Sequence, residues 1–194
     1  MPLVLGLGNP GARYARTRHN TGARVVERVV AKVHAEPLPE ASEYRAWHAR
    51  IEEQDLDLMV SRTYMNDTGA ALAAWHSRQA LVPEDLLVVV DDVYLPIGRL
   101  RFRGTGSTGG HQGLASVENA LQSRNWARLR VGVGAAESSE RLGEHVLEEF
   151  EPEELKPMER AIERAADAVV CWTTEGLARA MNRFNAEEEE VSES

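Results

Sequence analysis

The chain contains a single cysteine, Cys171, among its 194 residues. One thiol excludes an intramolecular disulfide and argues against a cysteine-based metal site. Long apolar runs are missing as well, because none approaches the ~20 residues that a membrane-spanning helix needs. The apolar start at residues 1–8 is short, lacks a basic leader and runs into a turn, so it does not have the pattern of a signal peptide. These absences lead us to expect a cytoplasmic protein without a membrane partner.

Lysine is also scarce, since twenty arginines and two lysines carry the positive charge. The net charge of −9 argues by itself against a nucleic-acid partner, but the charge is unevenly distributed. Residues 1–34 and 95–134 each carry +5, whereas residues 35–94 carry −8 and residues 135–194 carry −11. The two basic segments could form one anion site in the folded chain, or they could be ordinary solvated surface. The charge pattern leaves both interpretations open.

Predicted strands and helices alternate along the chain. Apolar or alternating runs predict strands over residues 3–7, 44–53, 57–62, 86–90, 98–103 and 129–134, the second and third joined by a hairpin turn at Gln54-Asp55. Helical periodicity and capping residues predict helices over residues 20–32, 66–79, 111–122, 138–147, 153–170 and 175–183. This alternation predicts a single-domain α/β sandwich with a mixed, mostly parallel sheet flanked by helices. We assign residues 1–185 to that domain and expect the acidic tail, residues 186–194, to be disordered.

Three polar residues follow or end predicted strands, namely Asn9, Asn66 and Asp91. Function in such sheets gathers at the carboxyl ends of the strands, so we expect these three residues to share one edge. Asn66 is also a suitable N-cap for the helix predicted after it.

A dinucleotide site is the first alternative, because Gly6-Leu-Gly8-Asn-Pro-Gly11 matches the pattern G-x-G-x-x-G. That site requires a helix opening at the third glycine and an acidic residue after a second strand. Residues 12–19 contain three arginines and no apolar face, and Glu27 falls within a predicted helix. These features disfavour a nicotinamide enzyme.

Five short motifs, in family order, resemble those of bacterial peptidyl-tRNA hydrolases. They are Leu5-Gly-Leu-Gly-Asn9-Pro-Gly with Thr17-Arg-His19-Asn20-x-Gly22, Thr63-Tyr-Met65-Asn66-x-x-Gly69, Asp91-Asp-x-x-Leu-Pro96-x-Gly98, Gly109-Gly-His111-x-Gly113-Leu, and Arg128-Leu-Arg130-Val-Gly-Val-Gly134. Each motif is weak alone, but five in order are specific. The resemblance implies hydrolysis of the ester between a peptide and the 3′ ribose of tRNA, releasing free tRNA and peptide. It further implies a monomer that needs no cofactor and no obligate protein partner.

The resemblance assigns His19 as the general base that activates water, and Asp91 as the carboxylate that fixes its tautomer. An imidazole suits this task because its ordinary pKa of ~6.5 lies close to neutral pH. Asn66 is implied to polarise the scissile carbonyl or to position the water. Taken alone, His19 would be a loop histidine and Asp91 a turn residue, so their roles depend on the joint pattern.

The implied substrate-binding residues are Asn9, Tyr14, Met65, Asn66, His111 and Gln112. Arg103 and Arg130 occupy positions where the family clamps the 5′-phosphate of tRNA, and guanidinium groups match phosphate oxygens in paired hydrogen bonds. Two positions depart from the family pattern, since Gln112 replaces the usual asparagine and Tyr94 the common aspartate. The remaining histidines lack metal-ligand spacing, so we expect no metal.

A non-catalytic RNA-binding relative is the second alternative. Such a protein would keep the fold and the basic cleft, but binding RNA does not require a histidine, an aspartate and two asparagines as a set. The joint presence of Asn9, His19, Asn66 and Asp91 therefore favours an enzyme.

Overall fold

The computed structural model describes residues 1–136 and 138–186. Within these residues the strands form one sheet, in the order β2-β3-β4-β1-β5-β7-β6. The strands are β1 (Leu3–Gly6), β2 (Glu36–Pro37), β3 (Tyr44–Ile51), β4 (Gln54–Ser61), β5 (Leu86–Asp92), β6 (Leu100–Arg103) and β7 (Ala127–Gly132). Parallel pairing joins β1 to β4 and β5, and β5 to β7, whereas the outer pairings are antiparallel. The predicted mixed sheet is confirmed, with its parallel pairings at the centre.

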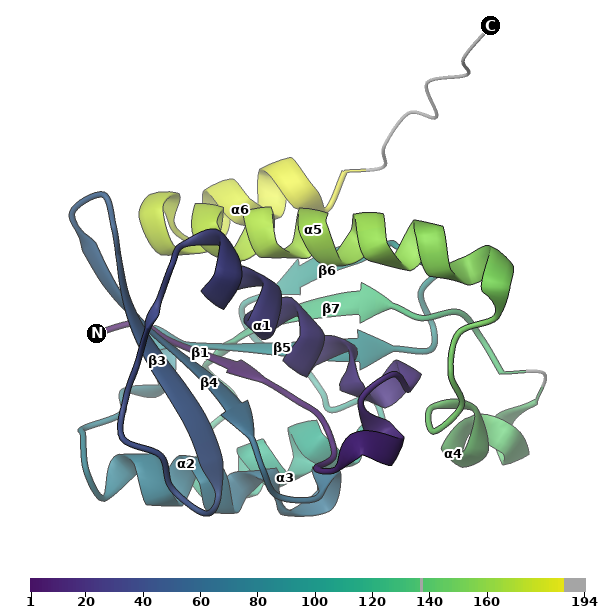
Figure 1. Ribbon diagram of the computed structural model, residues 1–194, viewed down its shortest axis with the longest axis horizontal. Helices are drawn as coiled ribbons and strands as arrows, with labels where there is room; N and C mark the ends of the chain where they lie inside the picture. Colours follow the sequence, from purple (N-terminus) through teal and green to yellow (C-terminus); the bar gives the residue numbers. More distant parts are fainter. Residues whose placement is uncertain (137, 187–194) are drawn as a thin grey trace, which may run out of the picture.

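Helices cover both faces of this sheet (Figure 1). One layer contains α1 (Thr21–Lys32), α5 (Pro152–Glu175) and α6 (Leu177–Phe184), and the other contains α2 (Thr68–His76) and α3 (Gln112–Leu121). Strand side chains alternate between two hydrophobic clusters, so that Val4 and Val89 pack with α1 and α5, while Leu5 and Val88 pack with α2 and α3. The short helix α4 (Leu142–His145) lies outside both layers, beyond the carboxyl ends of the parallel strands (Figure 1).

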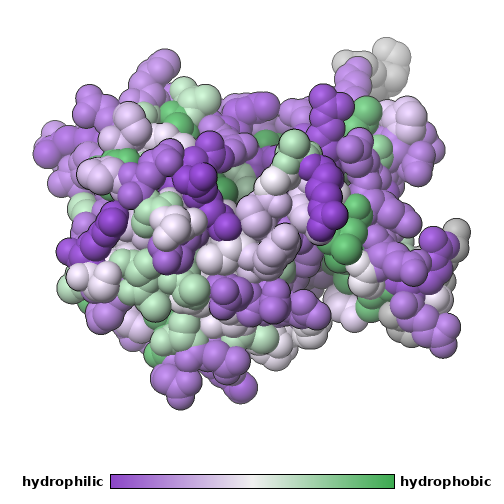
Figure 2. Space-filling view, turned by 60° about the horizontal axis from the view of Figure 1, so that its bottom comes forward, coloured by the Kyte–Doolittle hydropathy of each residue, from purple (hydrophilic) through white to green (hydrophobic). Residues whose placement is uncertain are grey.

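The surface on the α2–α3 side is mixed, with weakly hydrophobic and neutral residues among hydrophilic ones (Figure 2). These two helices direct Leu72, Trp75, Leu114 and Val117 into the core, whereas Ala73 of α2 is exposed. None of the helices in the described part of the chain is long and apolar enough to cross a bilayer.

The loop after β1 does not have the geometry of a dinucleotide-binding site, in which a helix begins directly at the third glycine. The sequence predicted this difference. Gly11 is followed by the short 3₁₀ helix η1 (Ala12–Tyr14), and α1 begins only at Thr21. Gly22 is closely packed, because a Cβ there would lie 2.2 Å from the carbonyl oxygen of Val89. This close approach fixes the start of α1 against β5, directly after the loop that carries His19.

Several element boundaries differ from the predictions for local reasons. The hairpin turn lies at residues 52–53, with Glu52 in the left-handed region, and not at Gln54-Asp55, which open β4. Asn66 does not cap α2, because the 3₁₀ helix η3 (Met65–Asp67) intervenes and its last turn is closed by the Thr68 hydroxyl, which donates to Met65 O at 2.9 Å. The predicted tail lies almost wholly outside the described residues.

Candidate active site

A cavity of about 520 Å³ opens at the carboxyl ends of β1 and β5. Every residue that the sequence proposed for catalysis or substrate binding lines it, namely Asn9, Tyr14, His19, Met65, Asn66, Asp91, His111 and Gln112. A further wall comes from the region of α4, through Leu142, Val146 and Leu147. The fold therefore collects side chains from six separate segments around one space large enough for a small substrate portion.

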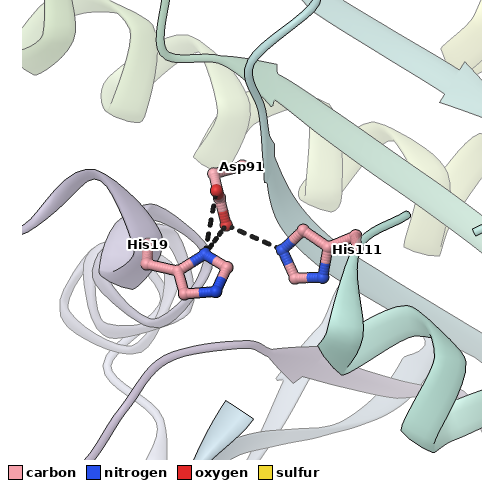
Figure 3. A group of neighbouring side chains, drawn as sticks. All are labelled: His19, Asp91 and His111. Carbon is pink, nitrogen blue, oxygen red and sulfur yellow. Dashed lines mark hydrogen bonds and ion pairs between the residues drawn. The ribbon is translucent and has the colours of Figure 1, made fainter. Parts of the chain in front are cut away.

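His19 and Asp91 form the closest functional pair in the cavity (Figure 3). His19 Nδ1 lies 3.0 Å from each oxygen of the Asp91 carboxylate. An ionised carboxylate can only accept hydrogen bonds, so Nδ1 carries a proton, and in the neutral ring Nε2 then has the lone pair. Nε2 lies on the side of the ring away from Asp91, where it is available to take a proton from water (Figure 3).

Asp91 is enclosed by protein, with 1% of its side chain exposed. Burial alone would raise the pKa of this carboxyl group, but its interactions with His111 and His19 outweigh burial and lower the pKa below its ordinary value. Asp91 therefore remains an anion throughout the range in which an imidazole works as a base.

The backbone of the His19 loop is tied to the segment after α4. His19 N donates to Val146 O at 2.8 Å, and the neighbouring Arg18 N donates to Glu148 O at 3.0 Å. The buried Arg18 side chain donates to Val133 O at 2.9 Å and to the Glu154 carboxylate at 2.6 Å. Burial opposes ionisation of Glu154, but the Arg18 hydrogen bond prevails and lowers its pKa. Arg18 was missed as a supporting residue, although it lies within the first motif, directly before His19.

The two amide side chains differ in what they can offer a substrate. Asn9 Oδ1 accepts from Met65 N at 2.8 Å, which leaves the Asn9 NH₂ group as the part free to bind substrate. Asn20 holds the Asn9 backbone with two reciprocal hydrogen bonds, of 2.9 Å and 3.0 Å. The Asn66 side chain is exposed to the cavity and makes no hydrogen bond to another described residue. Asn20 was missed as a site residue, although it belongs to the first motif.

His111 lies beside the His19–Asp91 pair, and its Nε2 is 3.1 Å from Asp91 Oδ1 (Figure 3). The ring centroids of the two histidines are 4.8 Å apart. These three side chains are of types that bind metal ions, and their nearest ligand atoms lie within 4.8 Å of one another. Both contacts to Asp91 nevertheless have the lengths and partners of ordinary N–H···O hydrogen bonds. Hydrogen bonds therefore suffice to explain how Asp91 holds both rings.

Arginine side chains line a second pocket of about 260 Å³ next to the first. The register pairs Arg103 with Arg128 and Arg101 with Arg130 across β6 and β7, so all four share one face of the sheet. Arg130 reaches both cavities and donates to Asp92 at 3.1 Å. Asp92 is the single acidic residue among those that line this pocket in the described chain.

Arg128 is the buried member of this group and lies 3.7 Å above the Trp126 ring. Burial and the nearby Arg130 charge lower its pKa to about 10. The sequence identified Arg103 and Arg130 but missed Arg101, Arg128 and Asp92. For the two arginines, a signal was present in the sequence, because arginines alternate along both strands. Only the pairing of β6 with β7 places these arginines on one face.

The two departures from the family pattern leave the His19–Asp91 pair untouched. Tyr94 is 69% exposed at the rim of the cavity, and its backbone N–H donates to Asp92 rather than to Asp91. Gln112 opens α3 with an exposed side chain that faces the cavity.

Comparison with known proteins agrees with this geometry. A family model for peptidyl-tRNA hydrolase matches residues 3–192. The peptidyl-tRNA hydrolase of Rhodopirellula baltica is 40% identical over 96% of this chain and 98% of its own, and that of Thermus thermophilus is 42% identical over 95% and 96%. The crystal structure of the Acinetobacter baumannii enzyme is similar with a TM-score of 0.90 and 32% identity, covering 97% of this chain and 96% of the other. This chain belongs to the peptidyl-tRNA hydrolase family.

Proposed function

We propose that this chain hydrolyses the ester of peptidyl-tRNA with His19 as general base and Asp91 as the group that fixes its tautomer. The observation that carries the proposal is the contact between His19 Nδ1 and the buried Asp91 carboxylate, which leaves Nε2 free at the cavity. A purely RNA-binding relative would have no use for an ionised carboxylate buried against an imidazole, because burying a charge costs free energy.

The proposed reaction needs only water as co-reactant. His19 Nε2 takes a proton from a water molecule while the water oxygen adds to the ester carbonyl carbon. The amide N–H group of Asn66 stabilises the negative charge that develops on the carbonyl oxygen. The tetrahedral intermediate then expels the 3′ oxygen of the ribose, which receives the proton from His19. The products are a free peptide and a tRNA with a free 3′ hydroxyl.

A peptidyl-tRNA hydrolase of this design should spare free aminoacyl-tRNA. The Asn9 NH₂ group can donate to the carbonyl oxygen of a second amide, but it repels a charged α-amino group, which is also costly to desolvate. We expect kcat/KM on an N-acylated aminoacyl-tRNA to exceed that on the unacylated form by at least about 10²-fold. Release of free tRNA and acyl-amino acid measures both. Equal rates on the two substrates would refute the assignment of Asn9, and binding without any release would favour the RNA-binding alternative.

We propose that the arginine pocket binds a phosphate of the tRNA, through Arg103 and Arg130. Their Ala variants should each raise KM for peptidyl-tRNA with a smaller effect on kcat, and should lower the salt dependence of tRNA binding by about one phosphate contact. A peptide esterified to a short 3′ fragment should respond little. Arg50→Ala serves as the control, because Arg50 pairs with Glu53 on the distant hairpin. If both variants lost the same activity on the fragment as on whole tRNA, the two arginines would not be phosphate ligands.

We further propose that the enzyme acts in the cytoplasm, where translation produces its substrate, as a monomer without cofactor or obligate protein partner. Light scattering on the purified chain, with activity measured on the same fraction, tests the oligomeric state.

A further inference from the structure

The start of α3 fixes the protonation state of His111. The backbone N–H groups of Gly113 and Leu114 point at His111 Nδ1, at 3.1 Å and 3.4 Å. Both groups are donors, so Nδ1 must be the acceptor and cannot carry a proton. The proton is then on Nε2, which lies 3.1 Å from Asp91 Oδ1. Both nitrogens of this ring are therefore engaged within the protein, and neither is left to bind substrate.

Asp91 depends on this second imidazole. The groups that face its carboxylate are His19 from the first loop and His111 from the start of α3, and in the described chain these rings supply all of its side-chain hydrogen bonds. With the His111 donor removed, a carboxylate that is 1% exposed would be left with the single N–H group of His19, which both of its oxygens would have to share. It could then rotate or take up a proton, and in either case its hold on His19 Nδ1 would weaken.

The His111 side chain is held in a fixed position by the start of α3, so it can orient the Asp91 carboxylate. His111 is the N-cap of α3, and its side chain accepts from the first turn of that helix. Gly113 lies so close to the end of β1 that an added Cβ would be 2.5 Å from Met65 Sδ and 2.8 Å from Leu7 Cδ1. The helix start cannot shift toward β1, so Nε2 of His111 is held in a fixed place relative to Asp91.

We propose that His111 is a positioning residue of the hydrolysis: its Nε2–H group aims and retains the Asp91 carboxylate that in turn holds the tautomer of His19. Figure 3 shows the arrangement, with Asp91 bridging the two rings. The inference deepens the proposed function and rests on it. It departs from the sequence expectation that His111 contacts the substrate, because its ring nitrogens are already used.

Two substitutions separate this role from that of a helix cap. An asparagine amide oxygen lies about where histidine has Nδ1, so His111→Asn keeps the cap and removes the donor to Asp91. A glutamine amide nitrogen lies about where histidine has Nε2, so His111→Gln keeps the donor and removes the cap. We expect His111→Asn to remain folded and to lose ~10–100-fold in kcat with little change in KM, because the lost hydrogen bond is to a charged group. His111→Gln should lose thermal stability and keep most of its kcat.

The decisive readout is the tautomer of His19, measured from the ¹⁵N chemical shifts of its ring at neutral pH. Wild type and His111→Gln should show the proton on Nδ1, and His111→Asn should show a mixture of tautomers. A wild-type tautomer and wild-type kcat in His111→Asn would overturn the inference. A raised KM with an unchanged tautomer would also overturn it and make His111 a substrate contact. The spectrum requires no substrate, so it tests the role of His111 independently of the hydrolysis. If the proposed hydrolysis were wrong, the wild-type protein would show no activity in the assay.

Discussion

Replacement of His19 by alanine is expected to lower kcat by ~10²–10⁴-fold, which is the contribution of a general base. Folding and tRNA binding should change little. The ring lies at the cavity with 12% of its side chain exposed, so its removal leaves no large void in the core. Single-turnover hydrolysis of a peptidyl-tRNA, a thermal melt and a tRNA binding titration measure the three quantities.

A surface histidine provides the control for that variant. His34 is exposed and adopts a left-handed backbone conformation, which asparagine tolerates, so His34→Asn should be indistinguishable from wild type. If His19→Ala retained most of the wild-type turnover, His19 would not be the base and the proposed mechanism would fail. If it lost tRNA binding in parallel, His19 would be a substrate contact instead.

Asp91→Asn is expected to have an effect of similar size, about 10²–10⁴-fold in kcat, with a folded protein. Asparagine keeps the shape of aspartate but can offer an NH₂ group to His19 Nδ1, which would place the proton of the imidazole on Nε2. The lone pair that accepts the proton of water would then face position 91 and not the substrate. Asp55→Asn on the exposed hairpin is the matched control. Wild-type kcat in Asp91→Asn would remove this residue from the mechanism.

The pH dependence of that loss has a definite sign. Because the folded-state pKa of Asp91 is lowered, its carboxylate contributes stability above the unfolded pKa of ~3.9 and loses it only as the pH falls through the folded value. Asp91 is therefore ionised at every pH at which the enzyme works. We expect the ratio of wild-type to Asp91→Asn rates to stay constant above the acid limb of the profile, and the stability difference to shrink below pH ~4. A ratio that varies with pH above that limb would mean that Asp91 itself titrates during the reaction.

The sequence alone was sufficient for most strands and helices and for eight residues that line the cavity, although it missed the supporting residues Arg18 and Asn20. Strand β5 is a run of apolar residues, and α1 repeats Val25, Val26 and Val29 at helical spacing, so local preference and burial require the same structure. Because the carboxyl ends of parallel strands meet at one edge, the positions of Asn9 and Asp91 after apolar runs placed them in the same cavity. Where a local preference competed with a neighbour, prediction failed: Asn66 is a good cap by type, but the 3₁₀ turn at Met65 moved the helix start to Thr68.

Only the tertiary structure decided what each side chain has left to offer. His19 and Asp91 are 72 residues apart, and Asp91 and His111 are 20 apart, so no local pattern could show that one carboxylate accepts from both rings. Arg130 is a second example. The sequence shows it as one positive charge of a basic segment, but only the structure shows that its guanidinium donates to Asp92. A residue type states how many donors and acceptors a side chain has. Which of them remain free is set by the partners that the fold brings within ~3 Å, because hydrogen bonds weaken steeply beyond that distance.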